Sequence, residues 1–287
     1  MTTTTLPSPA QRLSPFRLIN SELLKLRSTT TWWWFAGGTL LWTAISLAFN
    51  IWFASMAFDD PAAFGDPEGT GVADPLYHGG NVYTSGQFLG LMFVMLLGIV
   101  IVTSEYFHQT VTVTYLTTPH RTKVILNKLI TAVLLGALFG VITTGISIAF
   151  GSLFFSGQEA GTMLGEWSVQ RAILLNLVAF VVWAILGVAI GTLITSQLAA
   201  TITAAVLYLV GTQVASLLFL LLANWLNNDS ILQWQVNVPS IVSQVMTLSG
   251  DGLPGTPAWW VGALILLGYA AVAGVTGVLI TRRRDIS

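Results

Sequence analysis

The segment Glu105–Lys128, EYFHQTVTVTYLTTPHRTKVILNK, is a polar interruption between two long apolar runs of the chain. It holds three of the eleven Lys and Arg residues and two of the three His residues. Charged side chains are costly inside a bilayer, so this segment must lie at a membrane surface if the flanking runs cross the membrane. The organisation of the chain follows from what lies on either side of it.

The composition identifies an integral membrane protein. Of the 287 residues, 54% are hydrophobic and only 8% are charged, and the mean hydropathy is +0.76. A soluble domain carries about 25% charged residues, so this chain has too few of them to cover a globule with polar surface. The net charge of −1 argues against nucleic-acid binding. The absence of cysteine excludes a disulfide framework and thiolate chemistry.

Six apolar runs approach or exceed the ~20 residues that a spanning helix needs. They cover residues 32–58, 87–104, 124–155, 172–195, 198–222 and 259–281. The third run is too long for one crossing, so its first turns, up to Lys128, are expected outside the bilayer. The fourth and fifth runs are divided only by Ser196-Gln197, which predicts a tight turn. The sequence therefore predicts an all-α membrane protein with six transmembrane helices in residues 32–281.

The basic residues predict which side of the membrane is cytoplasmic, because Lys and Arg concentrate at the cytoplasmic ends of spans. With six spans, ten of the eleven basic residues fall on one side, and only Arg171 falls on the other. Nine of the twelve acidic residues lie on the side of Arg171. Both termini are therefore predicted to be cytoplasmic.

The N-terminal region predicts a tail and a helix at the membrane surface. Residues 1–13 are Thr- and Pro-rich and are expected to be disordered. Ser14-Pro15 is a helix-start signal, and apolar residues then recur at helical spacing at Phe16, Ile19, Leu23 and Leu26. This pattern predicts an amphipathic helix in residues 14–31 that lies in the inner interface. Residues 282–287 are expected to form a cytoplasmic tail.

Two polar segments are predicted on the outer side. Residues 59–85 contain five acidic residues and no Lys or Arg, which predicts an external loop with little regular structure. Their spacing does not match a calcium-binding loop, so no metal site is predicted. Residues 224–257 are too polar to cross the bilayer. Within them Pro239 predicts the start of a short helix in the outer interface, which serves either as a loop cap or as an outer gate.

Three of the runs contain or adjoin a G-x-x-x-G pattern, at Gly86/Gly90, Gly136/Gly140 and Gly187/Gly191. Small residues four positions apart let two helix backbones approach closely. The pattern predicts tight helix packing without indicating a particular partner.

The sequence lacks the residues of several kinds of chemistry. No charged residue falls in the middle of a run, which argues against coupling to a proton or sodium gradient. No His pair has metal-ligand spacing with a carboxylate, and neither a nucleophile turn nor a phosphate-binding loop is present. No catalytic residue is predicted, and the chain is not expected to be an enzyme. If it transports a substrate against a gradient, another subunit must supply the energy.

Several short motifs resemble those of the membrane permeases of type 2 ABC exporters, especially the actinobacterial kind. The resemblance covers nearly the whole chain. It rests on the six-span order and on these motifs: Glu22-Leu23-Leu24-Lys25-Leu26-Arg27-Ser28-Thr29 before span one, and Glu105-Tyr106, Thr110, Thr112, Thr118-Pro119-His120-Arg121 and Lys128 after span two. It implies a permease in the plasma membrane of a bacterium.

The resemblance also implies partners and site residues. The permease would work as a homodimer or with a close relative, together with two copies of a separate ATP-binding subunit. That subunit would bind ATP and Mg²⁺, and this chain would bind no cofactor. The segment after span two would form a coupling helix that docks on the ATP-binding subunit beside the N-terminal helix. The residues expected to couple the subunits are Glu22, Lys25, Arg27, Glu105, Tyr106, His108, Thr110, His120, Arg121 and Lys123.

The roles of the charged coupling residues have alternatives. Glu105 would pair with a basic residue of the partner or cap local amides. Arg121 and Lys123 would pair with acidic residues of the partner or lie at the lipid headgroups. The alternation TVTVTY in residues 110–115 is typical of a strand. An isolated strand would leave backbone groups unpaired, so a helix is expected, with a second helix starting at Thr118-Pro119.

The function expected from these observations is export of an amphiphilic or apolar substrate, such as a drug, lipid or peptide. Its path would run along spans one and five, where Asn50, Tyr208 and Gln213 supply polar groups. The alternative is a membrane subunit that transports nothing and senses an external ligand through residues 59–85 or 224–257. A membrane enzyme is disfavoured because no catalytic cluster is present.

Overall fold

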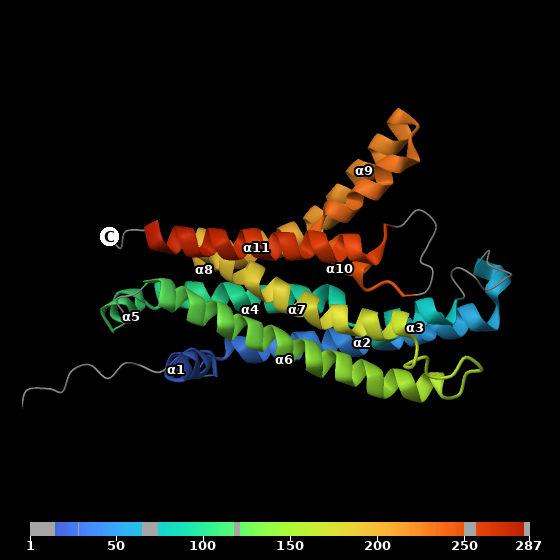
Figure 1. Ribbon diagram of the computed structural model, residues 1–287, viewed down its shortest axis with the longest axis horizontal. Helices are drawn as coiled ribbons and strands as arrows, with labels where there is room; N and C mark the ends of the chain where they lie inside the picture. The colour runs from blue at the N-terminus through green and yellow to red at the C-terminus, as the bar shows by residue number, and fades with distance from the viewer. Residues whose placement is uncertain (1–14, 28, 65–73, 118–120, 250–256, 284–287) are drawn as a thin grey trace, which may run out of the picture.

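The computed structural model describes residues 15–27, 29–64, 74–117, 121–249 and 257–283, and every regular element in these ranges is helical (Figure 1). Six helical segments in the described ranges are long and apolar enough to cross a membrane. They are Thr31–Asp59, Pro75–Phe107, Thr122–Phe155, Trp167–Leu193, Gln197–Leu226 and Trp259–Thr281. The prediction of an all-α protein with six candidate spans is confirmed.

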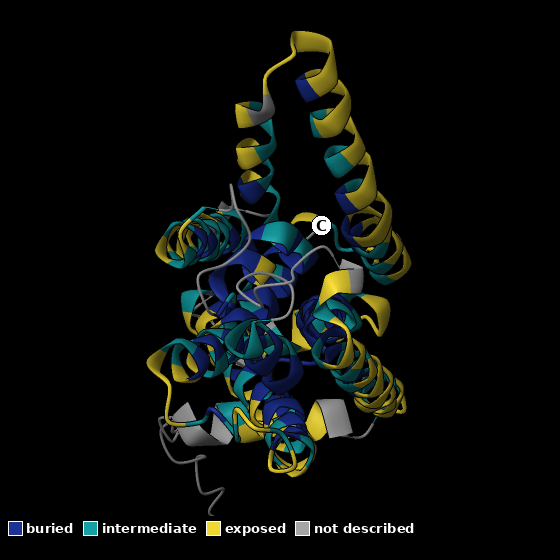
Figure 2. Cartoon of the chain, turned by 90° about the vertical axis from the view of Figure 1, so that its right-hand side faces the viewer, coloured by how far each residue is buried: buried dark blue, intermediate teal, exposed yellow. Residues whose placement is uncertain are grey.

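The bundle is built around two central helices, α4 (Gln87–Phe107) and α7 (Trp167–Leu193), which share the largest interface. Around them α2 (Thr31–Asp59), α6 (Arg121–Phe155) and α11 (Trp259–Arg283) run along the long axis of the molecule (Figure 1). The α4 sequence is apolar on all sides, as expected for a helix surrounded by others. Most of its side chains are buried, whereas the outer helices keep wide exposed faces (Figure 2).

A short helix, α3 (Pro75–Tyr83), precedes α4 and is packed into the bundle. Asp74 caps the start of this helix, because its side chain accepts a hydrogen bond from the Leu76 amide at 2.9 Å. His78, within the helix, is buried. The prediction of little regular structure was therefore wrong for this part of residues 59–85. The two adjacent glycines of this helix suggest a loop when only the sequence is known. In the structure Gly80 serves packing instead, because it lies so close to Ser249 that a side chain at this position would not fit. Residues 65–73, with Asp66 and Glu68, lie outside the described ranges.

The fifth candidate span is interrupted by a π-helical turn. It consists of α8 (Gln197–Val206), the turn η2 (Leu207–Gly211) and α9 (Thr212–Leu226). After η2, α9 leaves the bundle at an angle (Figure 1), which agrees with the known tendency of π-turns to bend helices. The 3₁₀ helix η3 (Asp229–Asn237) packs against α9, and together they form a largely exposed arm (Figure 2).

The predicted short helix before the last span is confirmed as α10 (Pro239–Met246). Its Val242 and Met246 are fully buried, and Gly262 of α11 lies close against its backbone. The Trp183 indole donates a hydrogen bond to Ser243 Oγ at 2.8 Å, which joins α10 to α7. The helix is therefore part of the packed bundle. A second 3₁₀ turn, η1 (Pro61–Phe64), follows α2.

The N-terminal helix α1 (Pro15–Arg27) is shorter than the predicted residues 14–31. It lies across the end of the bundle and does not run along the spans (Figure 1). The short helix α5 (Val111–Thr117) lies at the same end. The helical prediction for residues 110–115 is therefore confirmed from Val111 onward. The predicted helix start at Thr118-Pro119 lies outside the described residues, and α6 begins at Arg121.

Candidate functional site

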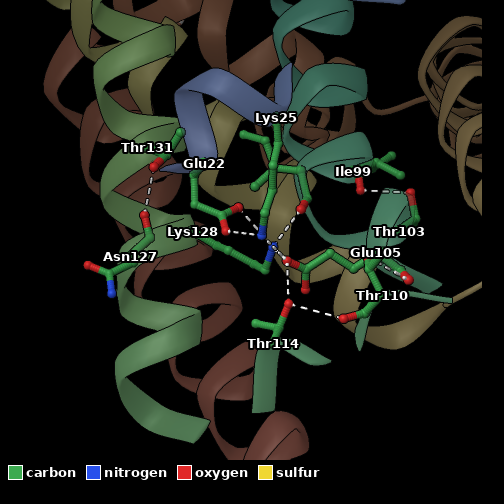
Figure 3. A network of polar contacts seen from close by, with 11 residues as sticks. Glu22, Lys25, Ile99, Thr103, Glu105, Thr110, Thr114, Asn127, Lys128 and Thr131 are labelled. Carbon is green, nitrogen blue, oxygen red and sulfur yellow. Dashed lines mark hydrogen bonds and ion pairs between the residues drawn. The ribbon is translucent and has the colours of Figure 1, made fainter. Parts of the chain in front are cut away.

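Four charged side chains meet where α1 crosses the ends of α4 and α6 (Figure 3). Lys25 Nζ lies 2.8 Å from Glu22 Oε1 and 2.7 Å from Glu105 Oε1. Lys128 Nζ lies 2.9 Å from Glu22 Oε2 and 3.1 Å from Glu105 Oε1. Glu105 and Lys128 are only 4% and 3% exposed. We call these four residues the ionic cluster, and it connects three helices that are distant in sequence.

The ammonium group of Lys128 is surrounded by acceptors. Nζ donates to Glu22 Oε2 at 2.9 Å and to the backbone oxygen of Ile101 at 2.8 Å, and it forms an ion pair with Glu105. A lysine has three N–H donors and no acceptor, so these three contacts match its capacity. Lys25 is different, because nearly half of its side chain remains exposed. The cluster is therefore closed on the side of Lys128 and open to the surroundings on the side of Lys25.

Local backbone geometry at the end of α4 brings α5 to the ionic cluster. The Gln109 amide bonds to Tyr106 O at 3.2 Å, and the Thr110 amide bonds to Glu105 O at 2.9 Å. These two bonds form a Schellman motif, which needs a left-handed residue after the helix, and Gln109 takes that conformation with φ 55°. The chain therefore turns back, and Thr114 Oγ1 of α5 donates to Glu105 Oε1 at 3.3 Å (Figure 3).

The two cluster residues on α1 have shifted pKa values. Burial alone would raise the pKa of Glu22, but the charge of Lys128 and the hydrogen bond from Lys25 outweigh it, and the pKa is lowered from its ordinary value. Burial would lower the pKa of Lys25, but its hydrogen bonds to Glu105 and Glu22 outweigh that effect, and the pKa is raised. Both shifts favour the charged forms, so the fold stabilises the ion pairs near neutral pH.

A defined pH window for the stability of this joint follows from the two shifts. The lowered pKa of Glu22 stabilises the fold above its ordinary value of 4.5, and this contribution is lost as the pH falls through the folded-state value. The raised pKa of Lys25 stabilises the fold below 10.5, and this contribution is lost as the pH rises through the folded-state value. We expect the difference in unfolding free energy between wild type and Glu22→Gln to be constant between these limits and to shrink below pH 4.5.

The measurement is detergent-induced unfolding of the purified protein at a series of pH values. Glu166→Gln is the matched control, because Glu166 is exposed at the N-terminus of α7 and does not belong to the ionic cluster. Its difference from wild type should stay small at every pH. A Glu22→Gln difference that persists at pH 3 would contradict a role for the Glu22 charge.

The other predicted coupling residues lie around the ionic cluster. Tyr106 is half-buried and packs against the core, whereas His108 and Lys123 are exposed. Thr110 Oγ1 donates to Glu105 O at 3.4 Å. Arg27 and Arg121 belong to helices, but their side chains, like all of His120, lie outside the described part of the chain. Among the residues whose side chains the structure describes, His108, Thr110 and Lys123 are exposed, while Glu22, Lys25 and Glu105 are paired within the chain.

The three residues predicted for a substrate path are not brought together. Asn50 Nδ2 donates to Ser85 Oγ at 3.0 Å, which joins α2 to the start of α4. Tyr208 is buried in the π-turn, and its hydroxyl donates to Phe88 O at 2.6 Å. Gln213 is exposed on α9. In this structure the first two hold helices together.

Two members of the site were missing from the predicted set. Lys128 was named in the motif that carries the resemblance and as the end of the polar segment, but not among the coupling residues, and Thr114 was included only in the ambiguous TVTVTY stretch. A signal for Lys128 was present in the sequence, because a lysine directly before a long apolar run either reaches the membrane interface or pairs with an acidic residue. Nothing in the sequence shows which of the acidic residues supplies it.

The cluster has the chemistry of a mechanical connection. Its two carboxylates and two ammonium groups sum to zero charge, and their mutual bonds leave no free base or acid directed at a cavity. The adjacent cavity, lined by Glu105, Tyr106 and Lys128 among others, holds only about 20 Å³, which is about the space of one water molecule. It is too small for a substrate.

Comparison with known proteins gives a family for most of the chain. No curated protein matches the sequence. A family model described as "Protein of unknown function (DUF2705)" matches residues 39–287. The match includes Glu105 and Lys128 of the ionic cluster and begins after α1. Because the match covers well over half of the sequence, the chain belongs to the DUF2705 family.

Proposed function

We propose that this protein is the membrane permease subunit of an ATP-driven exporter of the type 2 ABC kind. Two copies, or this chain and a close relative, would assemble with two ATP-binding subunits and move an amphiphilic or apolar substrate out of the cytoplasm. The end of the bundle with α1 and α5 would face the cytoplasm of a bacterium. The six candidate spans and the absence of a phosphate-binding loop from the sequence support this proposal.

The observation that carries the proposal is the connection of α5 to the spans through the ionic cluster. A partner that pushes on α5 acts on Glu105 through Thr114 and through the short turn at Gln109. Glu105 is bonded to Lys25 of α1 and to Lys128 of α6. A force on α5 is therefore shared by α1, α4 and α6, which would move together. Rigid-body rotation of such a unit is a common way to change access to a site.

The surface of α5 favours a protein partner over plain solvent. Val113 and Leu116 are exposed three positions apart on this seven-residue helix, and the nearby Phe107 is exposed as well. Neighbouring apolar side chains at the end of a span are typical of an interaction site. His108 and Lys123 add polar groups beside them. We propose that this surface, together with α1, contacts the ATP-binding subunit.

The arm formed by α9 and η3 supports the proposed dimer. Exposed leucines occur on several sides of α9, and only a small part of the fifth span is buried within one chain. Lipid covers such a helix in part, but its departure from the bundle leaves it with few neighbours (Figure 2). A second permease that packs against α9 would bury these leucines and enclose a path between the copies.

The exposed surface of α5 predicts an assembly defect. Leu116→Ser should leave the fold intact and reduce co-purification of a nucleotide-binding subunit in mild detergent at least five-fold. The matched control is Leu153→Ser, because Leu153 is similarly exposed (70% against 79%) but lies at the far end of α6. The measurement is the amount of ATPase recovered with the tagged permease from its native host, and the rate of ATP hydrolysis by the complex.

Two results would count against the proposal. If the wild-type protein purifies without any ATP-hydrolysing partner, the non-transporting membrane subunit becomes the better explanation. If a partner is recovered equally well with Leu116→Ser and with wild type, the partner does not dock on α5.

A further inference from the structure

A pocket of about 370 Å³ lies between α1, the start of α2, α4 and α6. Small-molecule sites usually measure about 300–1,000 Å³, so this space is large enough for a ligand. From α1 come Asn20, Leu23 and Leu24, and from α6 come Leu135 and Leu138. It is separate from the ionic cluster, although α1 forms one wall of the pocket and two corners of the cluster.

The walls of the pocket are mostly hydrocarbon and aromatic. Five leucines, Phe139 and the two tryptophans Trp32 and Trp33 line it, and Asn20 is the one lining residue with an amide side chain. An occupant with a long apolar part suits such walls.

The pocket reaches from the outer surface of the bundle into its interior. Leu24 and Leu138 stand at the surface and are about half exposed, whereas Leu97 of α4 is only 2% exposed. One wall of the pocket is α1, the helix that crosses the end of the spans (Figure 1). In a membrane this level is the boundary between headgroups and acyl chains, where Trp side chains gather. The occupant therefore enters sideways from the leaflet on the side of α1.

We propose that this pocket binds one acyl chain of a glycerophospholipid. An acyl chain has no polar group along its length, which suits the leucine walls. A peptide segment would bring backbone groups that these walls leave unpaired. This inference does not depend on the proposed export function.

A bound chain would fasten α1 from its apolar side. Leu23 and Leu24 line the pocket, while Glu22 and Lys25 enter the ionic cluster. The lipid and the ion pairs therefore hold neighbouring residues of one short helix. The chain exchanges one hydrocarbon environment for another, so the attachment of α1 comes from van der Waals packing of the chain against Leu23 and Leu24.

The test is photo-crosslinking in reconstituted vesicles of phosphatidylglycerol. A small fraction of the lipid carries a diazirine in its acyl chain, and labelled residues are mapped by mass spectrometry. Lipid at the outer surface labels exposed residues of every span, including α9, which serves as an internal standard. Because Leu97 is buried within the protein, it is labelled only when a chain enters the pocket. We expect labelling of Leu97 and of the Leu23–Leu24 peptide in wild type.

Variants that fill the pocket give the second part of the test. Leu135→Trp and Leu138→Trp should reduce labelling of Leu97 at least five-fold relative to α9. The matched control is Leu134→Trp, because Leu134 is as exposed as Leu138 (48% and 49%) and lies on the same helix outside the pocket. It should label like wild type. Absence of label at Leu97 in wild type, or equal labelling in all four proteins, would overturn the proposal.

Discussion

Replacing Lys128 with Met is expected to lower the free energy of unfolding by about 3–5 kcal/mol. The change removes the ammonium group that both Glu22 and Glu105 contact, and it leaves Lys25 as the remaining cation of the ionic cluster. It also leaves the Ile101 oxygen without its bond from Nζ. Methionine has nearly the length of lysine, so the effect reports the lost charge more than a new cavity. Unfolding of the purified protein in mixed micelles of increasing dodecyl sulfate content measures it.

The matched control is Lys123→Met, which changes an exposed lysine on the same helix. Surface ion pairs contribute about 0–1 kcal/mol, so this variant should unfold almost like wild type. A double-mutant cycle with Glu105→Gln isolates the contact between Glu105 and Lys128. The combined variant should cost less than the sum of the single variants, by about 0.5–3 kcal/mol. Equal unfolding free energies for Lys128→Met and Lys123→Met would show that the ionic cluster does not stabilise the fold.

The fold was largely predictable because apolar periodicity and charge decide where a membrane chain can cross. Each of the six runs became a candidate span, and the helix beginning at Pro239 was found. The helix α3 was not predicted, because its Gly79-Gly80 pair reads as a turn signal in sequence. In the structure these glycines instead permit close contact with Val169 and Ser249. The residues next to a glycine do not show whether that glycine permits close packing or forms a turn.

The candidate site was predictable as a set of residues but not as an arrangement. Glu22, Lys25 and Glu105 were expected to face a partner subunit, and the structure pairs them within the chain. Whether two charges separated by 80 positions meet depends on how α1 crosses the bundle, and no local pattern encodes that crossing. Lys128, at the start of an apolar run, is a position where an acidic partner would stabilise the charge, but the sequence does not show which residue supplies it.

The second large effect is expected at Gly187, where α7 lies directly against α4. A Cβ atom at this position would overlap the backbone oxygen of Met95 and press on Gly98 Cα. These obstacles are backbone atoms, which no rotamer change can move. We expect Gly187→Ala to lower the free energy of unfolding by about 1–3 kcal/mol or more, because the two central helices must separate. The measurement is again unfolding in mixed micelles.

Gly145→Ala gives this prediction a control of opposite sign. Gly145 also lies inside a long helix, α6, but a Cβ atom there meets nothing within 4 Å. Alanine in a helix interior is favoured over glycine by roughly 0.5–1 kcal/mol, so Gly145→Ala should stabilise the protein slightly. If helix propensity dominated at both positions, both variants would be stabilised. Only close backbone contact between α4 and α7 makes the same substitution stabilising in one helix and destabilising in the other.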